Sequence, residues 1–124
     1  MIRFLYLILL IVIIGTKAIA FELIMIDSKN CVYCTKFKNE VIPDFNISNL
    51  PIIIVEQSNQ PKWFIQAVEQ KKIKPWRGTP IFIVWNDLEK YEIDRISGYL
   101  GKDNFHNQLE KIFVNFLKKN SLSN

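Results

Sequence analysis

The two cysteines of this chain, Cys31 and Cys34, stand at the junction between a strand-like segment and a helix-like segment, and the sequence contains no others. A cysteine that caps a helix lies beside unpaired N–H groups and the positive end of the helix dipole, and both stabilise a thiolate. A second cysteine one turn further along lies within disulfide reach of the first. The pattern therefore predicts a dithiol that can switch between a reduced and an oxidised state.

The first twenty residues have the character of a secretory leader. Arg3 supplies a short positive region, residues 4–15 are continuously apolar, and Ala18-Ile19-Ala20 fits a small-residue cleavage site. The apolar run is shorter than the roughly twenty residues needed to cross a bilayer core, so cleavage is favoured over retention as a membrane anchor. We predict a leader over residues 1–20, a domain over 21–118 and a tail over 119–124, in a periplasmic or secreted protein.

The charge of the chain argues against binding to nucleic acid. The net charge is +4 at pH 7, and it includes Arg3 and Lys17 of the predicted leader. The remaining excess is too small for a phosphate-binding surface, and most of the lysines are scattered along the sequence. Without the leader, the chain has room for one compact domain.

Apolar runs separated by turn residues predict the element order β-α-β-α-β-β-α. Strands are expected at residues 21–27, 51–56, 80–85 and 90–96. Helices are expected from Cys31 towards Pro43, from Pro61 to about Ile73, and after an N-cap at Asp103. The apolar face of the last helix would consist of Phe105, Leu109, Ile112, Phe113, Phe116 and Leu117. One parallel crossover and one antiparallel hairpin predict an α/β fold with a mixed four-stranded sheet and helices on both faces.

This element order, with a Cys-x-x-Cys pair opening the first helix and Thr79-Pro80 opening the third strand, resembles the thioredoxin fold reduced to its minimal core. A narrower resemblance is to the small periplasmic thioredoxin-like proteins of sulfur-oxidation operons, the SoxS type. It rests on the helix that runs through Glu40-Val41 to Pro43 and on the late Gly98-Tyr99-Leu100-Gly101 segment.

The resemblance implies a thiol:disulfide oxidoreductase that needs no cofactor beyond its own dithiol. Such a protein would take electrons from a membrane thiol transporter and pass them to a cysteine or disulfide of a periplasmic protein partner. The chain is expected to act as a monomer.

Individual residues receive roles in this interpretation. Cys31 would be the nucleophile that forms a mixed disulfide, and Cys34 would resolve it. The resemblance makes the Thr79–Pro80 bond cis and places it against the cysteines, so that the backbone of Thr79 can pair with an extended substrate.

Four further residues are expected to support the site. Lys29 places a cation near Cys31. Tyr33 either presents its ring to the partner or packs locally, and Trp76 rims the site or is structural. Gly98 either admits close approach near the cysteines or simply ends the fourth strand.

Two departures from classical thioredoxins leave the chemistry open. Asn30 precedes the pair and Val32-Tyr33 separates the cysteines, so redox poise cannot be taken from thioredoxin. The buried acid that thioredoxins use to deprotonate the second thiol would fall at Met25, and Asp27 comes two residues later. Proton handling at Cys34 is therefore unassigned.

Other interpretations of the cysteine pair stay open. A structural staple is disfavoured because so short a loop stabilises little. A structural zinc needs four ligands, and the chain offers two cysteines and the distant His106, so no metal is expected unless two chains share one. The functional alternatives are a redox-responsive binding or regulatory module, a disulfide isomerase and a thiol reductant of cytochrome c maturation.

Overall fold

A computed structural model describes residues 20–45 and 50–122 of the chain. The elements are β1 (Phe21–Asp27), α2 (Val32–Glu40), the 3₁₀ turn η1 (Ile42–Asp44), β2 (Ile52–Glu56), α3 (Lys62–Glu69), β3 (Ile81–Asn86), β4 (Tyr91–Ser97) and α4 (Lys102–Leu122). The predicted element order is confirmed. Nearly all of the predicted leader lies outside the described residues, and no helix among the described ones is long and apolar enough to span a membrane.

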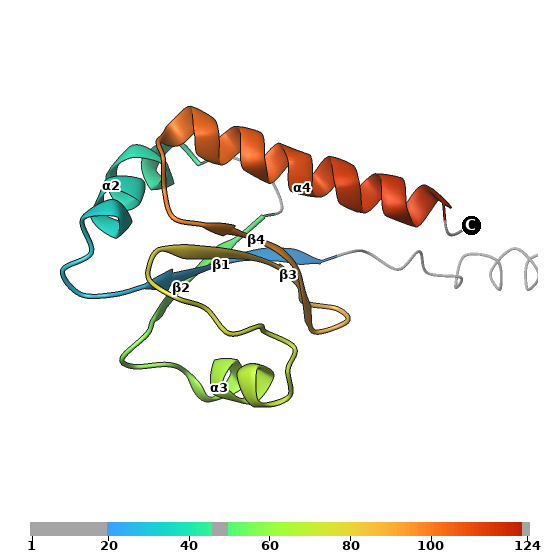
Figure 1. Ribbon diagram of the computed structural model, residues 1–124, viewed down its shortest axis with the longest axis horizontal. Coiled ribbons are helices and arrows are strands. Elements are labelled where there is room, and N and C mark those ends of the chain that lie inside the picture. Colours follow the sequence, from blue (N-terminus) through green and yellow to red (C-terminus); the bar gives the residue numbers. More distant parts are fainter. Residues whose placement is uncertain (1–19, 46–49, 123–124) are drawn as a thin grey trace, which may run out of the picture.

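The four strands form one mixed sheet in the order β2-β1-β3-β4. Strand β1 runs parallel to β2, with Leu23 opposite Ile52, and antiparallel to β3, which pairs with β4 as a hairpin. Helices α2 and α4 cover one face and α3 covers the other (Figure 1). The predicted mixed sheet with helices on both faces is confirmed.

The continuous apolar run of β1 is explained by a core on each face of the sheet. Successive side chains of a strand point to opposite faces. Leu23 and Met25 therefore pack with α2 and α4, whereas Ile24 and Ile26 pack with α3, and all four are fully buried. A strand that is covered on both sides has no face in contact with solvent, so its sequence is almost continuously apolar.

Aromatic rings fill the core beneath α2. Phe37 of α2 lies 4.4 Å from Phe82 of β3 and 5.0 Å from Phe105 of α4, measured between ring centroids. Burial of each such ring contributes about 1.5 to 3 kcal/mol to folding. This cluster fixes α2, and with it the cysteine pair, against the sheet.

Helix α3 is shorter than the sequence predicted. It ends at Glu69, and Lys71 adopts a left-handed conformation (φ 59°) that interrupts the helix. The backbone N–H groups of Lys72 and Ile73 then donate to the carbonyl of Ala67. Ile73 is buried as its apolar character predicted, but it packs from the loop after the helix.

The last helix differs from its prediction at both ends. It begins at Lys102, so Asp103 lies inside the first turn and the prediction that it is the N-cap is wrong. It continues to Leu122, beyond the predicted domain boundary at residue 118, because neither glycine nor proline interrupts this segment. Leu117 is 62 % exposed and does not belong to the packed face. In Figure 1 this end of α4 extends past the strands.

Candidate active site

Cys31 and Cys34 form a disulfide at the start of α2, with their Cα atoms 5.2 Å apart. Cys31 is the N-cap residue, and its extended backbone (φ −91°, ψ 105°) lets the side chain turn back over the first turn. The backbone N–H of Cys34 donates to the Sγ atom of Cys31 at 3.1 Å. A sulfur in this position can be stabilised as a thiolate by an otherwise unpaired N–H group and by the helix dipole.

The two sulfurs differ in access. Cys34 is 1 % exposed and belongs to the aromatic core beneath α2, whereas Cys31 is partly exposed. A sulfur atom of another molecule can therefore reach Cys31 but not Cys34. This asymmetry is what a nucleophile and a resolving thiol require.

Two exposed side chains with apolar surface follow Cys31 directly. Val32 is 76 % exposed and Tyr33 is 57 % exposed, so the Tyr33 ring faces solvent instead of packing locally. Lys29 is exposed in the loop between β1 and α2, beside Asn30, whose φ of 60° turns the chain into the helix. A supporting role for Lys29 and Tyr33 remains a prediction.

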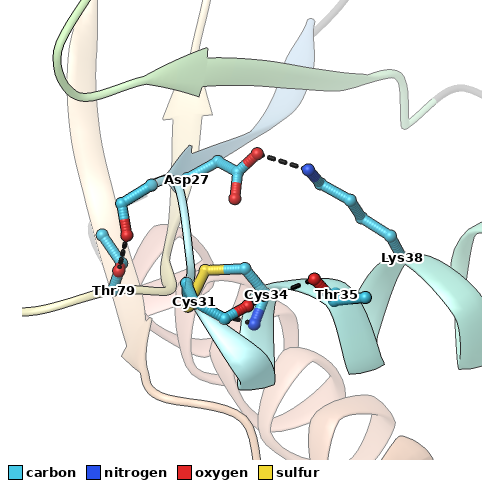
Figure 2. Close-up of a disulfide and its surroundings, with 7 residues drawn as sticks. Asp27, Cys31, Cys34, Thr35, Lys38 and Thr79 are labelled. Atoms are coloured by element: carbon cyan, nitrogen blue, oxygen red, sulfur yellow. Dashed lines mark hydrogen bonds and ion pairs between the residues drawn. A yellow bond between two sulfur atoms is a disulfide. The ribbon is translucent and has the colours of Figure 1, made fainter.

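A second loop meets the cysteine loop. The Thr79–Pro80 bond is cis, as predicted from the resemblance. The hydroxyl groups of Thr79 and Ser28 hydrogen-bond at 2.6 Å, which ties this loop to the segment before Cys31 (Figure 2). Among the described residues, the backbone N–H and C=O of Thr79 form no backbone hydrogen bond, so they remain available to an extended chain.

Gly98, the residue directly after β4, joins the same region. Its backbone N–H donates to the carbonyl of Pro80 at 2.9 Å, and its φ of +80° is a conformation that favours glycine. The next residue, Tyr99, packs on Phe37 and donates its hydroxyl to Glu40 at 2.5 Å. Burial, with the hydrogen bond and charge of Glu40, raises the pKa of Tyr99 well above its usual range, so the phenol stays a donor. These contacts tie the segment after β4 to α2.

Trp76 precedes the cis-proline loop and is partly buried. Its ring packs edge-to-face on Phe64 of α3, with centroids 5.6 Å apart. This contact belongs to the core on the opposite face of the sheet from the disulfide core. Trp76 therefore packs in the core beneath α3. That it also rims the site remains a prediction.

A buried ion pair, which the sequence analysis missed, holds the loop that leads to Thr79. Glu92 accepts from the Arg95 side chain at 2.6 Å and from the backbone N–H of Lys74 at 3.2 Å. Arg95 also donates to the carbonyls of Lys74 and Pro75 at 2.8 and 2.9 Å. The available sequence signal was an acid and an arginine three apart on a half-exposed strand, which could not identify a distant loop as their partner.

Replacing Arg95 by Gln should destabilise the protein by about 2 to 3 kcal/mol, because it removes two bonds to the loop and leaves the Glu92 carboxylate buried without its cation. Urea unfolding measures this loss. Arg77→Gln, a change at an exposed residue of the same loop, is the matched control and should stay within about 0.5 kcal/mol of the parent. Equal unfolding midpoints for the two variants would show that the ion pair does not hold the loop.

Asp27 is the acid that follows the expected position, Met25, by two residues. Strand alternation places it on the same face as Met25, next to α2, and it is only 7 % exposed. Its Oδ2 atom accepts from Lys38, which lies one helical turn after Cys34. Its Oδ1 atom is buried and has no hydrogen-bond partner among the described residues.

Figure 2 shows that this unpaired oxygen points towards the disulfide, while the other oxygen faces Lys38. A buried carboxylate oxygen without a donor is costly, and such groups often have a role in chemistry. The carboxylate thus presents an acceptor oxygen towards the disulfide, whose Cys34 side is buried. Within the described residues, no group of three or more His, Cys, Asp or Glu side chains is placed to hold a metal ion.

Comparison with known proteins supports the fold. No protein-family model matches the sequence, and no curated protein matches it. Among solved structures, the chain is similar to the crystal structure of the periplasmic thioredoxin SoxS from Paracoccus pantotrophus in its reduced form. The TM-score is 0.59 at 21 % sequence identity, over 74 % of this chain and 94 % of that one. The chain therefore has the thioredoxin fold that the sequence predicted.

Proposed function

We propose that this protein is an exported thiol:disulfide oxidoreductase that reduces a cysteine or disulfide of a periplasmic protein partner. The observation that carries the proposal is the asymmetry of the cysteine pair. One sulfur is accessible at the start of a helix and accepts an N–H bond, and it is joined to a second sulfur that is buried. The similarity to a periplasmic thioredoxin supports the same function and location.

The proposed reaction begins with the dithiol reduced. The Cys31 thiolate attacks one sulfur of the partner's disulfide, which forms a mixed disulfide and releases the other partner sulfur as a thiolate that takes up a proton. Cys34 then loses its proton to Asp27 and attacks Cys31. The Cys31–Cys34 disulfide forms, and the first partner sulfur leaves as a thiolate. The partner gains two electrons and the protein loses two.

The surface around Cys31 is suited to an extended partner segment. The free backbone groups of Thr79 can pair with the partner's main chain beside its cysteine, and the exposed Val32 and Tyr33 side chains can contact apolar neighbours of that cysteine. A membrane protein that carries a dithiol would return the protein to its reduced state. The dithiol is the one redox group that this scheme requires of the protein.

The reduction potential of the Cys31–Cys34 pair tests the proposal. We expect a value of about −270 mV, which suits a reductant. The measurement is equilibration in thiol buffers, followed by alkylation and mass-spectrometric counting of free cysteines. A value of about −120 mV would indicate donation of disulfides instead. A disulfide that stays oxidised until the potential falls below about −300 mV would be a structural bond, and this result would overturn the proposal.

A further inference from the structure

The sheet face covered by α3 has an uncovered end. Helix α3 has eight residues and is about 12 Å long, whereas the seven-residue strand β1 is about 23 Å long. The helix therefore covers Ile24 and Ile26, at the end of the strand nearest the disulfide, and leaves the start of β1 open. A cavity of about 450 Å³ lies there. Its volume is within the range of small-molecule sites.

The cavity, which we call the indole pocket, has an apolar and aromatic wall. Ile53 and Trp85 line it from the sheet, and Trp63 and Ala67 line it from α3. Trp85 is 3 % exposed, whereas Trp63 is 41 % exposed and stands edge-to-face on Phe64 with ring centroids 5.7 Å apart. A large indole held half-exposed beside an open cavity offers a ligand a flat apolar face.

The charged groups of the indole pocket are not equivalent. Glu22 lies on β1 directly opposite Trp85 in the strand pairing, and both residues line the pocket. Asp87 is already paired with Lys90, whose Nζ lies 2.5 Å from it in the hairpin turn. Lys72 is an exposed residue at the edge of the cavity and can move its ammonium into water. The described residues supply no hydrogen bond or ion pair to the Glu22 carboxylate, which the charge of Lys90 reaches without direct contact. Glu22 is therefore the anionic group of the pocket without a direct partner among the described residues.

We propose that the indole pocket binds a small organic cation, a primary ammonium group carried on an apolar or aromatic body. The ammonium would pair with Glu22, and the body would lie between Trp63 and the sheet. Trp faces attract cations, and a carboxylate and an ammonium form a charge-assisted hydrogen bond. This site lies on the opposite face of the sheet from the disulfide core, so it does not depend on the redox function.

The test uses 2-phenylethylammonium as the probe, with 2-phenylethanol and 3-phenylpropionate as its neutral and anionic counterparts. Binding is followed by NMR through the indole N–H signals of the three tryptophans of the full chain. We expect the ammonium to shift the signals of Trp63 and Trp85 but not of Trp76, which does not line the pocket. Tighter binding of the anion, equal binding of the alcohol, or no binding of the ammonium at millimolar concentration would each overturn the proposal.

Variants locate the site. Glu22→Gln should weaken binding of the ammonium about tenfold or more, and Trp63→Ala, at an exposed position, should weaken it too. Glu69→Gln, on α3 but outside the pocket, should change nothing. An unchanged affinity in Glu22→Gln would contradict the assignment.

A pH titration gives an independent readout. Burial, and then the charge of Asp87, raise the pKa of Glu22, while Lys90 opposes the shift. Affinity should therefore be full at neutral pH and fall on acidification as Glu22 becomes protonated, and this fall should be absent from Glu22→Gln. The same fall in both proteins would overturn the role of Glu22.

Discussion

Replacing Cys34 by Ser should stop turnover and leave the protein covalently joined to its partner through Cys31. The first step needs only the accessible sulfur at the start of α2, whereas release of the partner needs the buried one. Steady-state reduction of a protein disulfide should fall by about 1,000-fold or more, because an attack by the protein's own thiol is replaced by slow attack from solution. Non-reducing gels and mass spectrometry of the adduct measure the result.

Cys31→Ser is the matched control, since it removes the accessible sulfur and keeps the buried one. It should be equally inactive but form no adduct, because Cys34 is 1 % exposed. The comparison also separates the two classes of function. A redox-responsive binding module would form no adduct in either variant, and the affinity of the unmutated protein for a partner would differ between its dithiol and disulfide states. An adduct on Cys34 would contradict the assigned roles.

Replacing Asp27 by Asn should slow the resolving step by about 100-fold at neutral pH, a magnitude typical of a lost general base. The amide keeps the size of the side chain and can still accept from Lys38, but it cannot take up the proton of Cys34. The first step, attack by Cys31, should keep its rate. Rapid-quench measurement of the decay of the mixed disulfide separates the two steps.

The pH dependence distinguishes a chemical role of Asp27 from a structural one. In Asp27→Asn the resolving rate should rise steadily with pH, because hydroxide becomes the base. The substitution also removes the ion pair with Lys38 and places an amide NH2 at one of the two oxygen positions, so urea unfolding of the same variant separates a loss of stability from a loss of rate. Asp94→Asn, an exposed acid of β4, should behave as the parent does. A resolving step of unchanged rate in Asp27→Asn would show that another group accepts the proton.

Most of the fold could be predicted because the strands carry strong local signals. Strand β1 was predicted at its observed bounds. Seven mainly apolar residues followed by turn-forming ones are compatible with few secondary structures other than a short strand. The ends of α3 and α4 were not predicted at their observed positions. Ile73 continues the helical apolar pattern but reaches the core from a loop, and Leu117 fits the pattern of α4 yet lies where the helix extends past the strands. Periodicity reports which residues are apolar, and only packing decides which of them find a neighbour.

The candidate site divides in the same way. The sequence alone placed the cysteine pair at a helix start, because a strand-like run, turn residues and a helical apolar pattern are local signals. The cis Thr79–Pro80 bond was expected from the family resemblance, since an X-Pro bond in the sequence does not by itself indicate cis. The tertiary structure decided that Cys34 is buried and Cys31 accessible, that Ser28 and Thr79 bond, and that Arg95 holds the loop after α3. It also placed Asp27 beside α2, where its unpaired oxygen faces the disulfide. These features depend on contacts between residues that are distant in the chain, and such contacts form only when the sheet and helices pack together.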